Sequence, residues 1–168
     1  MRKNKMMKAM QGLLATALVA VIAFGSSGNA VRAAEVQASE ATSGAVALTA
    51  APPIELFSVF NPNHLYLENG VSTITPTKGK VTVSATTVAT RTVDSIGLIF
   101  YVQKWTGSSW DTVGAGSTVG TNNDSVYHNT FEKTVEAGYY YRARTIHWVI
   151  HNGVYEEGET ITSSVLGV

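Results

Sequence analysis

The aromatic and arginine residues in the second half of the chain are the side chains best suited to hold a ligand. Trp105 and Trp110 flank Thr106–Ser109, a short polar segment typical of a turn between two strands. A hairpin there would bring the two indoles together. The pair would then either fix the strand register by cross-strand contact or offer a flat surface on which the C–H face of a sugar stacks.

A second set of aromatic and basic side chains follows from alternation in Ser95–Trp105 and Tyr139–Ile150. If these segments are neighbouring strands, their alternate residues share one outer face. Exposed clusters of this kind often mark interaction surfaces, whereas arginines stacked on the rings would make the face structural. The candidate binding residues are Tyr101, Trp105, Trp110, Tyr140, Arg142, Arg144 and Trp148.

Metal-binding patterns are weak in this sequence. His147 and His151 are four residues apart and would share one side of a strand, but no further ligands follow at a suitable spacing. Glu156, Glu157 and Glu159 are more typical of a solvated acidic turn than of a calcium loop. We therefore predict no metal site and no other cofactor.

Catalytic motifs are equally hard to find. The chain has no cysteine, no Gly-x-Ser-x-Gly motif and no phosphate-binding glycine loop followed by a helix. We predict that the protein is not an enzyme. Gly114–Asp124 is rich in glycine and polar residues and is expected to be a loop. A small secreted enzyme or inhibitor with its site in this loop stays open as an alternative.

The elements that must position these residues are short strands. Lys80–Thr90 alternates apolar and polar residues, Ser95–Trp105 is the most apolar segment, and Asn69-Gly70 and Asn152-Gly153 are strong turn signals. No segment shows sustained helical spacing. About seven strands at regular spacing predict an all-β fold, a two-sheet antiparallel sandwich of immunoglobulin or fibronectin III type. A small closed barrel is the alternative.

Two resemblances support this fold. Glu136–Thr145, followed by Asn152-Gly153, resembles the closing hairpin of fibronectin type III modules; the resemblance implies that Tyr139 is the corner tyrosine and that Tyr139, Tyr141 and Ala143 face inward. The chain also resembles a family of short exported proteins of Gram-positive bacteria that share a domain of unknown function. The residues that carry this resemblance are Lys104–Trp110 and Tyr139–Arg142. That resemblance implies a fold and a compartment and carries no catalytic residues.

The N-terminal residues predict export. Arg2, Lys3, Lys5 and Lys8 precede an apolar run and then small residues, the pattern of a secretory signal peptide. We predict a signal peptide at 1–33, with cleavage after Ala33 or Ala30, a disordered Ala/Ser/Thr-rich leader at 34–53 and a β-sandwich domain at 54–168. The mature protein would be secreted, without a membrane span.

The charge of the mature chain limits its partners. Removing residues 1–33 leaves seven basic and twelve acidic residues, a net charge of −5, and no basic stripe for nucleic acid. The sequence therefore predicts a secreted, non-enzymatic domain that binds a cell-wall glycan or an extracellular protein. A structural or self-associating extracellular module is the main alternative, and the oligomeric state stays open.

Overall fold

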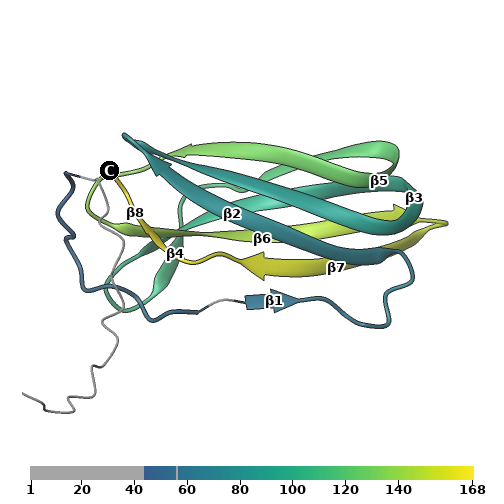
Figure 1. Ribbon diagram of the computed structural model, residues 1–168, viewed down its shortest axis with the longest axis horizontal. Coiled ribbons are helices and arrows are strands. Elements are labelled where there is room, and N and C mark those ends of the chain that lie inside the picture. The colour runs from purple at the N-terminus through teal and green to yellow at the C-terminus, as the bar shows by residue number, and fades with distance from the viewer. Residues whose placement is uncertain (1–43, 56) are drawn as a thin grey trace, which may run out of the picture. The chain divides into compact units, whose positions relative to one another are not determined.

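The computed structural model describes residues 44–55 and 57–168, all within one unit that spans Glu40–Val168 (Figure 1). Every pairing between its strands is antiparallel, and the described residues contain no helix, which confirms the predicted all-β class. The predicted signal peptide lies outside the described residues. The strands are β1 (Phe57–Val59), β2 (Leu67–Thr77), β3 (Lys80–Trp105), β4 (Trp110–Thr112), β5 (Ser117–Thr134), β6 (Tyr140–His151), β7 (Val154–Ile161) and β8 (Val165–Leu166).

The strands form one sheet in the order β1-β7-β6-β3-β2, with β4 and β5 paired to β3 and β8 paired to β6. The 26 residues of β3 replace the two separate strands expected at Lys80–Thr90 and Ser95–Trp105. Its first half pairs with β2, its second half with β6, and β5 follows both halves. This one long strand therefore connects the two parts of the sheet.

A bulge explains how β3 changes direction. Residues at odd positions, such as Val81 and Val83, are buried in its first half, whereas residues at even positions, such as Leu98 and Phe100, are buried in its second half. Side chains alternate strictly along a regular strand, so this change needs an irregularity. The pairing with β5 shifts register between Val88 and Val93, just before burial changes from odd to even positions between Val93 and Ile96.

The bend makes the two halves of β3 face each other across the core. Val81, Val83 and Ala85 belong to the same buried cluster as Leu98, Phe100 and Val102. Phe131 of β5 stacks on Phe100, with ring centroids 5.7 Å apart. The sheet is thus curled around an apolar interior (Figure 1).

The segment Gly114–Asp124 was expected to be a loop, and this expectation is wrong. β5 begins at Ser117 and pairs residue by residue with the second half of β3, including Gly120 opposite Gly97. Glycine usually weakens a strand, but it also permits close approach of another group. The polar, glycine-rich composition hid a strand that is half exposed.

The tyrosine whose hydroxyl bonds back to nearby backbone is Tyr141 and not Tyr139, which was expected in that role. The backbone N–H of Glu136 donates to the Tyr141 hydroxyl at 3.1 Å, and that hydroxyl donates to the Glu136 carbonyl at 3.1 Å. Tyr141 and Ala143 are buried as expected. Tyr139 is only partly buried and lies 3.5 Å below the Lys104 ammonium group, measured to the ring centroid.

The predicted leader is divided by the structure. Its residues 34–43 lie outside the described residues, while 44–53 contact the sheet. The Leu48 N–H donates to the Gly138 carbonyl at 2.7 Å, and the Ala50 carbonyl accepts from the Trp105 indole at 3.1 Å. Within 44–55 and 57–168, no helical segment has the length and hydropathy to cross a membrane.

Candidate functional site

Pairing of β3 with β6 places the predicted binding residues along one face of the sheet. Tyr101 lies opposite Arg144, Gln103 opposite Arg142 and Gly97 opposite Trp148. Tyr140 lies at the start of β6, is partly buried and pairs with Leu166. The face therefore runs from the β3–β4 hairpin at one end to Trp148 at the other, and its parts differ in character.

The hairpin end is occupied by its own contacts. The Trp105 and Trp110 ring centroids are 5.2 Å apart, and Trp105 is buried, with its N–H bonded to Ala50. Arg142 lies 4.3 Å from the Trp110 ring centroid and donates to Gln103 Oε1 at 2.8 Å. These contacts stabilise the hairpin and leave little of Trp105 for a ligand.

Both arginines of this face have carboxylate partners. Arg142 Nη1 donates to Glu55 at 3.1 Å, from the segment that precedes β1. Arg144 donates twice to Glu159, at 2.9 and 2.7 Å, and its guanidinium carbon lies 5.5 Å from the Tyr101 ring centroid. The hydrogen bond to Glu159 raises the pKa of Arg144, with burial opposing it. The positive charges of Arg142 and Arg144 in the middle of the face are therefore neutralised by carboxylates of the same protein.

Trp148 has a different environment from the other two indoles. It lies against Gly97 of β3 and Gly120 of β5, and a Cβ atom at position 120 would lie 2.8 Å from its Cζ2 atom. A side chain at either glycine would displace the ring. Two glycines side by side on neighbouring strands thus let the indole lie close to the sheet.

A shallow groove of about 230 Å³ adjoins this indole. It is lined by Ile99, Thr118, Trp148, Ile150 and Tyr155. Tyr155 is 51 % exposed, and its hydroxyl donates to Glu157 Oε2 at 2.7 Å. Burial and the hydrogen bond to Glu157 raise the pKa of Tyr155 to about 12, so the phenol stays protonated. The groove therefore combines an aromatic floor with a polar edge.

The two histidines do not act together. His151 Nδ1 lies 3.2 Å from Asp94, and its ring contacts Tyr66. His147 is fully buried between Thr87 and Thr160. No group of three or more His, Cys, Asp or Glu side chains in the described part of the chain is arranged to hold a metal ion.

The sequence suggested that Glu156, Glu157 and Glu159 form a solvated acidic turn, and this expectation is wrong. They lie on β7, where Glu159 pairs with Arg144 and Glu157 accepts from Tyr155. Glu156 is 8 % exposed and accepts the backbone N–H groups of Leu65, Tyr66 and Leu67 at 2.7 to 2.8 Å. Burial alone would raise the pKa of Glu156, but these three bonds lower it.

An interior chain of hydroxyl groups around His147 was missed by the sequence analysis. The Thr87 hydroxyl donates to the Gly97 carbonyl at 3.0 Å, so it must accept from His147 Nδ1–H. His147 Nε2 then accepts from Thr160 at 2.9 Å, and Thr160 accepts from Ser72 at 2.7 Å. The hydrogen bonds therefore all run in one direction, from Ser72 to Gly97.

The Thr160 hydroxyl beside His147 resembles a nucleophile next to a general base. Burial lowers the pKa of His147 to about 4, against a smaller opposing effect of a backbone bond with Thr86. The group that holds Nδ1 is a hydroxyl, which cannot stabilise an imidazolium ion as a carboxylate does. This series of hydrogen bonds is therefore better suited to joining β2, β3, β6 and β7 than to activating Thr160.

The glycines under Trp148 are the signal that sequence reasoning could have used. Gly97 and Gly120 interrupt otherwise β-prone segments, and isolated glycines in strands often mark close approach of another group. Without the register, nothing connects them to Trp148.

Comparison with known proteins finds no matching family model, no similar curated protein and no similar solved structure.

Proposed function

We propose that this protein is a secreted, non-enzymatic domain that binds a glycan of the cell envelope through the Trp148 groove. Export is supported by the basic, apolar and small residues at 1–33. The resemblance to short exported proteins of Gram-positive bacteria supports the same compartment. We also propose that the curled sheet is a two-layer sandwich of immunoglobulin or fibronectin III type, supported by the facing halves of β3 and by Tyr141 as corner tyrosine.

The observation that carries this proposal is the position of the Trp148 ring over two glycines. One side of the ring is occupied by the strands, so its other side is the surface available to a sugar ring. Ile99, Ile150 and Tyr155 extend this surface, and the Tyr155–Glu157 pair supplies polar groups at its edge. Glycans carry both apolar C–H faces and hydroxyl groups, which this arrangement matches.

A second observation argues that Trp148 is more than a packing residue. Its indole nitrogen is buried and has no hydrogen-bond partner in the described part of the chain. A buried N–H without an acceptor costs about 1–3 kcal/mol, which Phe or Leu at this position would avoid. The cost is understandable if the wide indole ring is needed for binding.

Titration of tryptophan fluorescence with soluble cell-wall polysaccharide tests the proposal. Trp148→Ala should weaken binding at least tenfold, Trp148→Phe should have an intermediate effect, and Trp110→Ala should change the affinity less than threefold because Arg142 already covers that ring. Melting curves confirm that the variants are folded. Unchanged binding by Trp148→Ala, or binding of an envelope protein and no polysaccharide, would contradict the glycan proposal.

A further inference from the structure

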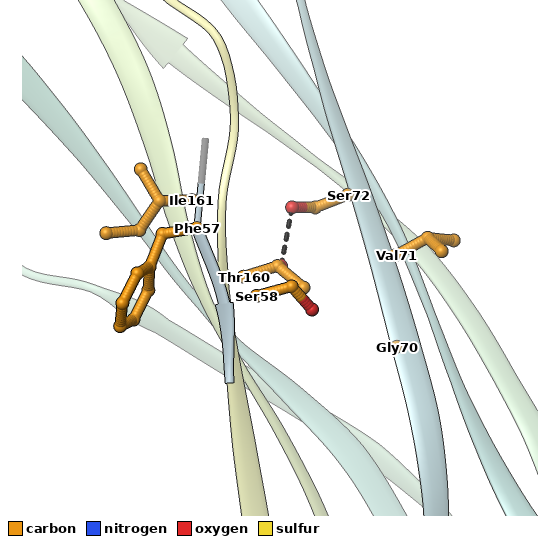
Figure 2. Close-up of a pocket in the computed structure, with 7 residues that line it drawn as sticks. All are labelled: Phe57, Ser58, Gly70, Val71, Ser72, Thr160 and Ile161. Atoms are coloured by element: carbon orange, nitrogen blue, oxygen red, sulfur yellow. Dashed lines mark hydrogen bonds between the residues drawn. The ribbon is translucent and has the colours of Figure 1, made fainter. Parts of the chain in front are cut away.

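A groove of about 340 Å³ separates β2 from β1, with β7 between them (Figure 2). Ser72 points across the groove toward Thr160, and their hydroxyl oxygens are 2.7 Å apart. Ser58 of β1 lies on the same side as Thr160, whereas the side chains of Phe57 and Ile161 point away from β2. All the lining residues are uncharged: Phe57, Ser58, Gly70, Val71, Ser72, Thr160 and Ile161.

The edge of β2 that borders this groove carries unpaired backbone groups. β2 pairs only with β3 among the described strands, from Leu67 to Thr77. A two-residue turn joins Thr77 to Lys80, which makes this pair and every second pair before it the hydrogen-bonded ones. The N–H groups of Gly70, Ser72 and Ile74 therefore point away from β3. Pro76, which has no N–H, occupies the next such position, as expected for a free edge.

The edge of β2 also lacks the usual protection against pairing. Natural edge strands carry charges or prolines that discourage an added strand. Between Gly70 and Thr75, β2 has neither. β5 is the internal comparison, because its outer edge is also unpaired in the described part of the chain, yet it carries Asp124, Glu132 and Lys133. Of these two edges, only that of β2 is open to pairing in this sense.

The position of β1 shows where an added strand would lie. β2 packs against β6 and β7, while β1 is one strand further along the sheet and contacts only β7 among the described strands. A strand added to β2 at the usual spacing would therefore cover the side of β1 on which Ser58 lies. A second copy could not supply its own β2 by two-fold symmetry, because β1 and β7 of the two copies would need the same space.

We propose that the free edge of β2 binds an extended, uncharged polypeptide segment of a partner protein, seated in this groove over β1. Backbone pairing with Gly70, Ser72 and Ile74 would supply affinity, as in other cases of strand addition. Side chains at alternate positions of the segment would face Ser58 on the groove side of β1, so small or β-branched residues fit there. The groove shares no lining residue with the Trp148 groove, so this site is independent of the proposed glycan site.

Amide hydrogen exchange of the mature protein, measured by NMR, tests this proposal with a synthetic probe. The probe is the acetylated and amidated peptide Lys-Thr-Val-Thr-Val-Thr-Val-Thr-Lys. At saturation it should slow exchange at Gly70, Ser72 and Ile74 at least tenfold and leave the β5 amides unchanged. The same peptide with its central valine replaced by proline or aspartate should bind at least tenfold more weakly.

Variants separate this site from other surfaces. Ser72→Pro removes an outward N–H, and Ser58→Lys places a charge in the groove without touching β2; each should weaken peptide binding at least tenfold. Val126→Lys makes a similar change on β5, where Val126 is 48 % exposed, and should have less than a twofold effect. The proposal is overturned by a lack of saturable binding, by undiminished binding to Ser58→Lys, or by protection of β5 instead. A soluble oligosaccharide that protects these amides when the peptide does not would also overturn it.

Discussion

At the scale of single residues, His147 shows how burial changes the chemistry of a side chain. The imidazole is fully buried, and each ring nitrogen lies about 3 Å from a threonine hydroxyl. The directions of these hydrogen bonds require the neutral ring with its proton on Nδ1. A protonated ring would have to donate to Thr160, so the Thr160 hydroxyl could no longer donate to Nε2.

This environment predicts a loss of stability in weak acid. The pKa of His147 is about 4 in the folded protein and 6.5 in the unfolded reference, so the unfolded chain binds a proton that the folded protein does not. Stability should therefore fall as the pH decreases from about 6.5 to about 4, by roughly 3 kcal/mol in total. Urea unfolding at a series of pH values measures this slope.

A matched variant identifies the residue responsible for this slope. His147→Gln should be less stable at neutral pH but should flatten the pH dependence between pH 6.5 and 4. His128→Gln removes an exposed histidine that bonds to Thr86 and should leave the slope in place. An unchanged slope in His147→Gln would show that another group titrates in this range.

At the scale of elements, Glu156 on β7 holds the segment that leads into β2. One carboxylate accepts three consecutive backbone N–H groups, from Leu65 to Leu67, that no strand satisfies. Hydrogen bonds to a charged group are about twice as strong as neutral ones. This single side chain therefore fixes where β2 begins.

Replacing this carboxylate should loosen the start of β2. Glu156→Gln has only one acceptor oxygen for three donors and should lower the free energy of unfolding by about 2 kcal/mol. Amide exchange at Leu65, Tyr66 and Leu67 should accelerate. Glu157→Gln, one position away on the exposed side of β7, is the control and should change stability by less than about 0.5 kcal/mol. Equal effects of the two variants would contradict this role.

The elements also show what the sequence could and could not predict. Alternation identified the strands from Lys80 to Trp105 and from Tyr139 to Ile150, because a half-buried strand leaves a period-two pattern. It did not predict that β3 continues through its bulge, since a bulge keeps the backbone extended while reversing which positions are buried. Gly97, Gly120 and Trp148 meet only through pairing of three strands, and no local pattern records that register.

At the scale of the whole molecule, most contacts join segments that are far apart in the sequence. β3 pairs with β5 and β6, and β1 pairs with β7 more than ninety residues later. The chain has no cysteine to shorten the search for these partners. Long-range strand pairing loses chain entropy before it gains contacts, so it is slow.

We therefore expect slow, cooperative folding that does not depend on redox conditions. Stopped-flow refolding from urea should give time constants of about milliseconds to seconds, and reducing agent should leave the unfolding midpoint unchanged. The far-ultraviolet circular dichroism spectrum should be dominated by strand. Refolding within microseconds, or a spectrum dominated by helix, would contradict the long-range topology.

The contacts of Gly138 have a consequence for the two ends of the described chain. Its carbonyl accepts from Leu48, and its N–H donates to the Gly167 carbonyl at 3.0 Å. The polypeptide thus enters and leaves the sheet at one place. A circularly permuted version, with a short linker joining these ends and new termini opened at Asn152-Gly153, would keep every strand pairing except that of the hairpin itself. The same proximity would let the whole domain be inserted into a loop of another protein without stretching its host.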